Sequence, residues 1–112
     1  MLLDIEYKQE TLLVRASGEL DLSIADNMRD QLEEYLDREP VRHIVFNLAG
    51  VSFLDSTVLG VILGRYKRIS KNGGKVFIVA PQPQVRKILE LSGFFRIMNE
   101  SDSEDDALQK LG

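Results

Sequence analysis

The segment from Val51 to Lys67 reads VSFLDSTVLGVILGRYK, and the fold can be worked out from it in both directions. An apolar run leads into Asp-Ser-Thr, and a second apolar run with helical spacing leads out. Ser, Thr and Asp are favoured at helix starts because their oxygens accept hydrogen bonds from backbone N–H groups that lack a helical partner. The pattern therefore predicts a helix from about Thr57 to Lys71, with Ser56 at its N-cap.

Ser56 has two interpretations, and the local pattern leaves both open. As an N-cap, its hydroxyl only satisfies the first backbone N–H groups of the helix. As a switch, it accepts a phosphate, because those N–H groups and the helix dipole stabilise negative charge at this position. A phosphate adds about −1.5 to −2 charges, so modification would change this surface strongly.

The predicted helix is flanked by two buried strands. Ile44 to Leu48 and Val76 to Ala80 are nearly continuous apolar runs, which are typical of central strands covered on both faces. Residues 49–55 are predicted as a loop that leads to the helix. His43 is interpreted as a residue at the start of its strand rather than as a functional group.

Two features of the helix itself carry expectations. Gly60 and Gly64 lie four residues apart and predict close packing against a neighbouring element. The basic residues near the helix C-terminus suit the dipole, and they are either solvated or paired with acidic residues of a partner. They are Arg65, Lys67, Arg68 and Lys71.

The N-terminal part predicts a β-hairpin followed by an amphipathic helix. Leu2 to Tyr7 and Leu12 to Ala16 are short strands joined by a polar turn. Gly18 to Asp21 ends the second strand, and Ser23 is predicted to cap the helix. Helical spacing places the apolar positions on one face: Ile24, Ala25, Met28, Leu32, Tyr35 and Leu36. The acidic residues of the other face are expected to be solvated: Asp30, Glu33, Glu34 and Asp37.

The C-terminal part predicts two more helices. The first runs from about Pro83 to Ser92, since Pro is tolerated at a helix start, and Leu91 is expected to point inward. Phe94 to Met98 is apolar and is interpreted as an edge strand. A short terminal helix begins at Ser101 or at Ser103, because both positions fit a capping box.

This order of elements predicts the fold class. Strands alternate with helices after an opening hairpin, which indicates a single α/β domain over residues 1–112 with a mixed sheet, mostly parallel in its later part. Sites in parallel units gather at the carboxyl ends of strands. Ser56 and Asp21 both follow strands, so we expect them to be neighbours.

Composition excludes several functional classes. The chain has 112 residues, one histidine, no cysteine and a formal net charge of −4. Disulfides, thiolate catalysis and a transition-metal site are therefore not expected, nor is non-specific nucleic-acid binding. No apolar run approaches the ~20 residues that span a bilayer, and no signal peptide is recognisable. We expect a cytoplasmic protein that needs no cofactor and is not an enzyme, because no nucleophile has an identifiable base and no Gly-rich phosphate loop is present.

Four stretches resemble one known family. They are FLDSTVLGVILGRYK (53–67), GELD (18–21), VRHIV (41–45) and LSGF (91–94). In this order they resemble the STAS family, named for sulfate transporters and anti-sigma factor antagonists. The GRYK ending is most similar to the sporulation branch of the antagonists, the stage II sporulation protein AA group that frees sigma-F, and the Asp-Ser-Thr triplet also resembles the general-stress antagonists.

The resemblance implies a fold and a mechanism. The unphosphorylated antagonist would bind an anti-sigma factor that is also a serine kinase, and binding would release a sigma factor. The kinase would then phosphorylate Ser56, with Thr57 as a lower-ranked acceptor, and a separate phosphatase would reset the protein. The chain is expected to be a monomer when free. The partner-binding residues would be Asp21, Leu22, Ser23, Asp55, Ser56, Thr57 and Val58, with Ile24 as a further apolar candidate.

One departure from the family pattern concerns Val58. The family usually has Gly there, so Val58 either obstructs docking and phosphorylation at Ser56 or simply fills space in a helix. Two other functions remain open: a STAS scaffold or transporter-associated subunit without phosphorylation, and a small-molecule or nucleotide-binding domain. The acceptor Ser56 argues against the first, and the lack of a phosphate-cradling loop argues against the second.

Overall fold

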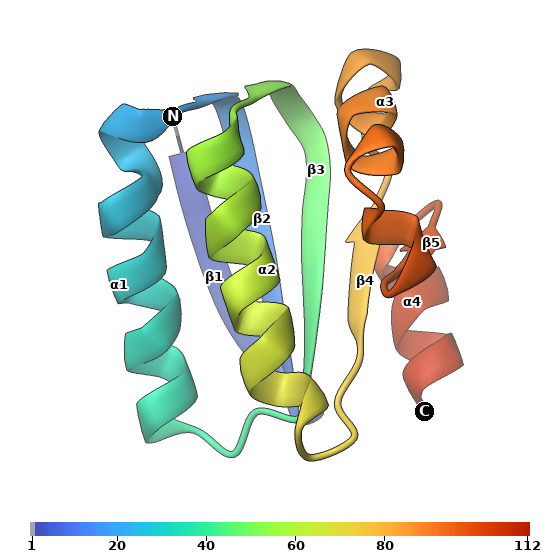
Figure 1. Ribbon diagram of the computed structural model, residues 1–112. Helices are drawn as coiled ribbons and strands as arrows, with labels where there is room; N and C mark the ends of the chain where they lie inside the picture. Colours follow the sequence, from blue (N-terminus) through green and yellow to red (C-terminus); the bar gives the residue numbers. More distant parts are fainter. Residues whose placement is uncertain (1) are drawn as a thin grey trace.

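The computed structural model describes residues 2–112, so Met1 lies outside the described residues. Five strands and four α-helices follow one another in the order that the sequence predicts, with a single 3-10 turn before the last strand (Figure 1). The elements are β1 (Leu2–Lys8), β2 (Thr11–Leu20), α1 (Leu22–Arg38), β3 (His43–Leu54), α2 (Ser56–Ser70), β4 (Val76–Val79), α3 (Pro83–Leu91), η1 (Phe94–Arg96), β5 (Asn99–Ser101) and α4 (Glu104–Leu111).

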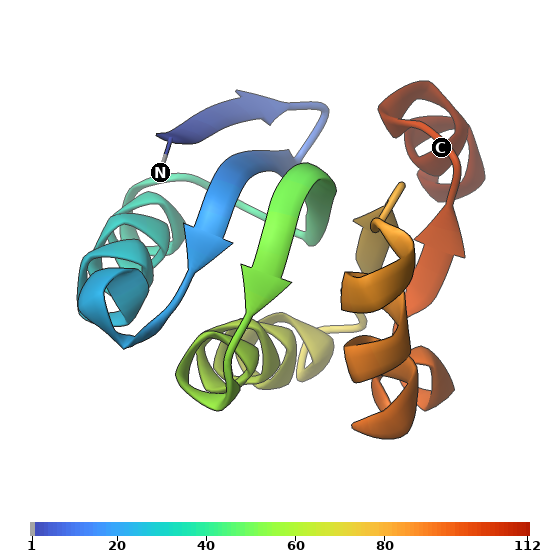
Figure 2. The ribbon, with the colours of Figure 1, turned by 90° about the horizontal axis from the view of Figure 1, so that it is seen from above.

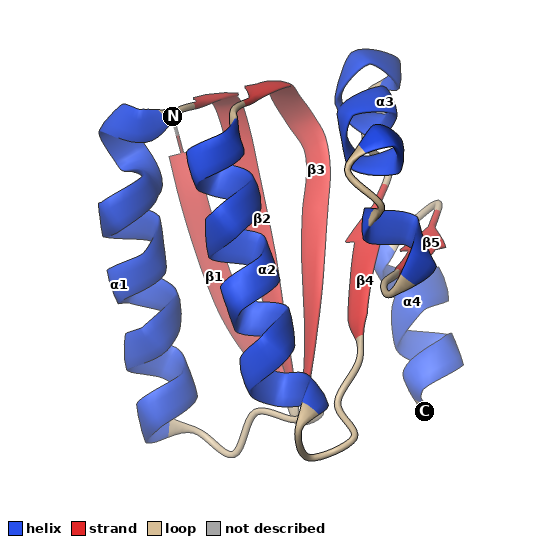
Figure 3. Ribbon diagram, in the orientation of Figure 1, coloured by secondary structure: helices blue, strands red, loops and turns tan. Residues whose placement is uncertain are grey.

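The strands form one mixed sheet in the order β1-β2-β3-β4-β5. β1 pairs with β2 antiparallel, and every later neighbour is parallel. Because the strands are added in one direction and such connections are right-handed, the connecting helices α1, α2 and α3 fall on one face. Figure 2 shows α4 on the other face, and Figure 3 shows the helices that flank the sheet. The α/β class with a mixed sheet is confirmed.

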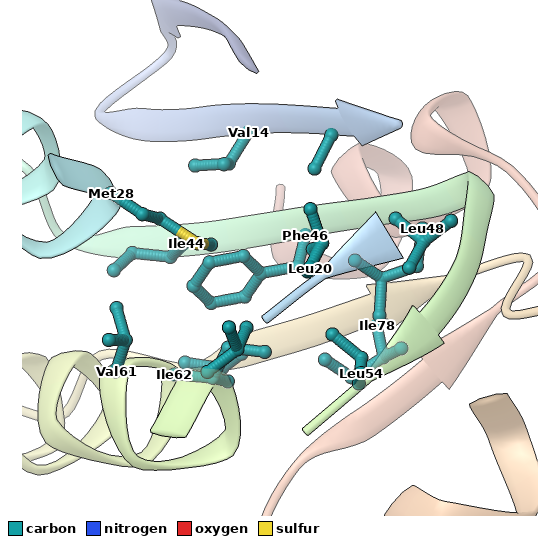
Figure 4. Packing of buried hydrophobic residues seen from close by; sticks show 14 of the residues in the cluster. Val14, Leu20, Met28, Ile44, Phe46, Leu48, Leu54, Val61, Ile62 and Ile78 are labelled. Atoms are coloured by element: carbon teal, nitrogen blue, oxygen red, sulfur yellow. The ribbon is translucent and has the colours of Figure 1, made fainter. Parts of the chain in front are cut away.

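Two hydrophobic cores hold the layers together. The larger lies between the sheet and α1, α2 and α3, and Phe46 of β3 is fully buried in it together with Met28 and Ile62 from the helices (Figure 4). The smaller lies under α4, where Val45 and Phe77 meet Ala107 and its neighbours. β3 and β4 therefore bury side chains on both faces, which explains their continuous apolar sequences.

β3 is longer than predicted. It continues to Leu54 instead of ending at Leu48, so residues 49–54 are strand rather than loop. The pairing with β2 has two register shifts, which β3 absorbs as extra residues. Gly50 allows this, since a Cβ there would lie 2.9 Å from the Cβ of Ser17. The extension carries the chain directly to the start of α2.

The C-terminal part differs from the prediction in the edge strand and in Leu91, and it settles the choice between two predicted caps. The apolar segment at 94–96 is a 3-10 turn, and the edge strand is the polar β5. Leu91 is 78 % exposed instead of inward. Of the two proposed caps for α4, Ser103 is the one that accepts a hydrogen bond, from the backbone N–H of Asp106 at 3.1 Å.

The basic end of α2 pairs mainly within the chain. Arg65 Nε lies 3.3 Å from Glu33 of α1, and Arg68 lies 3.1 Å from the same carboxylate and 2.8 Å from Asp37. Two of the four basic residues thus pair with carboxylates of α1, and part of the acidic face of α1 is engaged in these ion pairs. These pairs join α1 to α2.

Candidate functional site

Two helices begin side by side at the carboxyl ends of β2 and β3 (Figure 1). Leu20 and Leu54 are paired in the sheet, and the backbone N–H of Asp55 donates to the carbonyl of Leu20 at 3.1 Å. The residues after these leucines, Asp21 and Asp55, are the N-caps of α1 and α2. The predicted neighbourhood of Asp21 and Ser56 is confirmed, because parallel pairing brings both strand ends to one place.

Asp55 rather than Ser56 caps α2. Its Oδ1 accepts from the backbone N–H groups of Thr57 and Val58, at 3.0 and 3.2 Å, and from the Thr57 hydroxyl at 2.5 Å. The Thr57 hydroxyl is the main reason why the pKa of the Asp55 carboxyl lies below its ordinary value, and the backbone amides of Val58, Leu22 and Thr57 add to this against a smaller effect of burial. The carboxylate is therefore ionised and fixed at the helix start.

Asp21 caps α1 with the same local arrangement. Its Oδ1 accepts from the backbone N–H of Ser23 at 2.9 Å and from the Ser23 hydroxyl at 2.5 Å. The predicted cap at Ser23 is therefore wrong, because Ser23 supplies donors while Asp21 is the acceptor. The sequences LDLS (20–23) and LDST (54–57) thus build two matching helix starts.

Ser56 is the exposed first residue of α2, and Leu22 is its counterpart in α1. Ser56 takes no part in the hydrogen bonds of the cap, whereas the half-buried Thr57 spends its hydroxyl on Asp55. Leu22 is 70 % exposed although it is apolar. Ser56 is therefore the exposed hydroxyl of the two helix starts that no cap carboxylate binds, and a large exposed side chain lies on the neighbouring helix start.

At Ser56 the electrostatic effect of the helix dipole is opposed by the neighbouring Asp55 carboxylate. The helix dipole favours negative charge at this position. However, the backbone N–H groups of Thr57 and Val58 already donate to the Asp55 carboxylate. A phosphate on Ser56 would therefore lie beside an ionised carboxylate that already uses these two donors.

For Val58 the structure selects one of the two alternatives left open by the sequence, whereas the position of Phe53 was not predicted. Val58 is helical and fully buried in the main core, so it fills space there, and its side chain does not belong to the exposed surface. Phe53 is 44 % exposed at the end of β3 and was missed, because residues 49–55 were interpreted as a loop. Gly60 and Gly64 were also misinterpreted, since a Cβ at either position meets no atom within 4 Å. Gly60 lies on α2 one turn after Ser56.

Other kinds of site find no support in the described part of the chain. Within residues 2–112 no three His, Cys, Asp or Glu side chains are grouped so that they could hold a metal ion. In the same range no helix has the length and apolar character needed to cross a membrane.

Comparison with known proteins identifies the family of this α/β domain. A model of the STAS domain matches residues 3–107. The chain belongs to the STAS domain family. An anti-sigma F factor antagonist of Paenibacillus polymyxa is 42% identical over 109 residues, which cover 97% of this chain and 93% of the relative. The family resemblance inferred from the four sequence stretches is confirmed.

Solved structures of one STAS protein match nearly the whole domain. The anti-sigma factor antagonist SpoIIAA in its unphosphorylated form is 28% identical, with a TM-score of 0.87, and the match covers 98% of this chain and 96% of that chain. SpoIIAA in the phosphorylated form is 27% identical, with a TM-score of 0.79, over 99% of this chain and 100% of that chain. This STAS domain therefore resembles a protein that exists in both forms.

Proposed function

We propose that this STAS domain is an anti-sigma factor antagonist that acts in the cytoplasm. It binds a serine-kinase anti-sigma factor through the two matching helix starts and thereby releases a sigma factor. Phosphorylation of Ser56 ends the binding, and a phosphoserine phosphatase reverses it. The observation that carries the proposal is the exposure of Ser56 at the first position of α2, while the neighbouring hydroxyl of Thr57 is held by Asp55. The similarity to a named anti-sigma F factor antagonist supports the choice of partner.

The proposed contact surface follows from exposure. Leu22 is a large exposed apolar residue at the start of α1, and apolar anchors of this kind contribute most of the energy in many interfaces. Asp21, Ser23 and Asp55 surround it with polar groups whose positions are set by the caps. The surface needs no rearrangement to present these groups, which lowers the cost of binding.

The geometry also explains how a phosphate would act. The caps already place two carboxylates, Asp21 and Asp55, at this surface. A phosphate on Ser56 brings about −1.5 to −2 additional charges to a surface that would be desolvated in the complex. The backbone N–H groups of Thr57 and Val58 already donate to Asp55, so they are not free to bind the phosphate oxygens. We therefore expect loss of binding without a change of fold.

The test is incubation with a serine-kinase anti-sigma factor and ATP, followed by mass mapping. Modification of Ser56, and its loss in Ser56→Ala, would support the proposal. Modification of Thr57 in the wild type would contradict it, because that hydroxyl is bound to Asp55. If the kinase binds the protein and no residue is modified, the domain is a constitutive antagonist and the switch is refuted.

A binding measurement complements the mapping. Ser56→Ala should bind the kinase as the wild type does, whereas Ser56→Asp should bind at least about tenfold more weakly. Lys67→Gln is a matched control, because Lys67 is also exposed on α2 but lies at its far end. Equal affinity of Ser56→Asp and the wild type would refute the switch.

A further inference from the structure

A cavity of about 260 Å³ lies at the end of the sheet opposite to Ser56. Four segments meet there: the β1–β2 turn, the loop before β3, the loop before β4 and the end of α4. Most of its charged lining is basic, with Arg42, Lys75 and Lys110 around His43, and Glu10 is the acidic side chain among them. Figure 1 shows the two loops before β3 and β4 together at this end of the molecule.

The walls of this cavity are held firmly by the backbone. The carbonyl of Glu10 accepts from the N–H groups of Arg42 and His43, at 2.7 and 3.2 Å. Gln9 and Glu10 adopt left-handed conformations with φ of 55° and 58°, which side-chain-bearing residues rarely do. Gly74 packs so tightly that a Cβ there would lie 2.0 Å from the Arg42 carbonyl oxygen. The loop that carries Arg42 is thus fixed from both sides.

His43 supplies a buried donor to the cavity. The residue is only 8 % exposed, and its Nδ1 accepts from the backbone N–H of Lys75 at 2.9 Å. Because Nδ1 is an acceptor, the hydrogen of the neutral ring is on Nε2. Within residues 2–112 this Nε2–H has no hydrogen-bond partner, yet it is not sealed from solvent. His43 is one of the residues that line the cavity.

Of the three basic side chains that line the cavity, one is paired with a carboxylate and two are not. Lys110 pairs with Asp106 at 3.0 Å. Arg42 and Lys75 form no ion pair with any of residues 2–112. Burial, Arg42 and Lys75 together lower the pKa of His43, against an opposing effect of Glu10. Arg42 and Lys75, which form no ion pair within residues 2–112, thus line the same cavity as His43.

We propose that this cavity binds a small tetrahedral oxyanion, either phosphate or a phosphate monoester. Arg42 and Lys75 would neutralise its charge, and the Nε2–H of His43 would donate to one of its oxygens. The guanidinium fork and the ammonium group are the usual partners of phosphate oxygens in proteins. The proposal is independent of Ser56, which lies beyond the other end of β3.

A simpler explanation of the basic residues makes a different prediction. Cations near helix C-termini complement the dipoles of α1 and α2, which both end near this region. In that case they would attract anions only weakly, without saturation and without preference for the cavity. The two explanations can be separated because His43 is the only histidine of the chain and gives a single imidazole signal.

The experiment follows the His43 ring by NMR at about pH 7.5 while inorganic phosphate replaces chloride at constant ionic strength. The proposal expects a saturable shift and a rise in the pKa of His43, since a bound dianion outweighs the repulsion by Arg42 and Lys75. Repeating the titration with methyl phosphate distinguishes a monoester site from one that takes only the free ion. The proposal would be overturned if the His43 signal moved linearly with phosphate concentration and moved equally when chloride was titrated instead.

Variants make the test specific. Arg42→Gln and Lys75→Gln should each weaken phosphate binding by about fivefold or more, and Arg42→Lys should retain part of it. Lys71→Gln is the matched control, because Lys71 is also exposed near this end but does not line the cavity. If Lys71→Gln weakens binding as much as Lys75→Gln does, the effect is general attraction and the site does not exist. The side chains of Arg42 and Lys75 are both exposed, so these variants should fold normally. A well-dispersed amide NMR spectrum of each variant would verify this.

Discussion

Truncation of Val58 to Ala tests whether this residue, which departs from the family pattern, serves the hydrophobic core or the binding surface. Val58 is fully buried in the core between α2 and the sheet. Removing its two methyl groups costs ~0.8 kcal/mol each in transfer free energy, and the remaining cavity adds about 1 kcal/mol. Ala is the better helix former by about 0.5 kcal/mol. We therefore expect the free energy of unfolding to fall by about 2 kcal/mol.

Val58→Gly should cost more, although Gly is the usual residue of the family here. It removes a third carbon and adds a helix penalty of about 1 kcal/mol, for a total of about 4 kcal/mol. Urea unfolding followed by circular dichroism measures both variants. Leu22→Ala is the control, since Leu22 is 70 % exposed and its truncation should change stability by less than about 0.5 kcal/mol.

The same variants separate a core role from a surface role. If Val58 only fills space, Val58→Ala binds the kinase with unchanged affinity at a temperature where it is folded, whereas Leu22→Ala binds more weakly. A loss of less than about 0.5 kcal/mol in stability for Val58→Ala, or a clear change in its affinity for the kinase, would refute the reasoning from burial.

Three further outcomes follow from charged and titrating groups. Glu33→Ala should destabilise the fold by about 1–3 kcal/mol in urea unfolding, because Arg65 Nε is buried and its neighbouring carboxylate would be gone; an unchanged midpoint would refute this. The pKa of His43 is lowered in the folded protein, so as the pH falls the unfolded chain takes up this proton before the folded one does. The free energy of unfolding should therefore decline as the pH falls below the ordinary value of 6.5. His43→Gln should lose this pH dependence of stability between about pH 7.5 and 5.5. Carbon NMR should find that Asp55 titrates below its usual range and that Thr57→Val raises its pKa, since the Thr57 hydroxyl is the main cause of the shift; equal values in both proteins would contradict the cap geometry.

Local patterns in the sequence account for the fold class and for the site's position. Helical spacing after Asp55 and the apolar runs of β3 and β4 are properties of neighbouring residues, so they can be read without knowledge of the fold. The same holds for the Asp-Ser-Thr triplet, whose residue types are those of a helix start. Parallel alternation then implies that strand ends share an edge, which was sufficient to predict that Asp21 lies near Ser56.

Other features depend on partners that are distant in the chain. Which oxygen caps α2 was decided by backbone geometry at Asp55, since Asp, Ser and Thr are all suitable caps by type. The extension of β3 to Leu54 depends on pairing with β2, and the exposure of Leu91 depends on how α3 sits on the sheet. The cavity beside His43 depends on four separate segments that meet there.

The sequence by itself thus determined the fold class, the order of the elements and the presence of a serine at a helix start, because these follow from interactions over a few residues. Only the tertiary structure decided that Val58 belongs to the core, that Arg65 pairs with Glu33, and that Arg42 and Lys75 converge on one histidine. Burial and charge pairing depend on which surfaces the packed elements cover, and no local pattern contains that information.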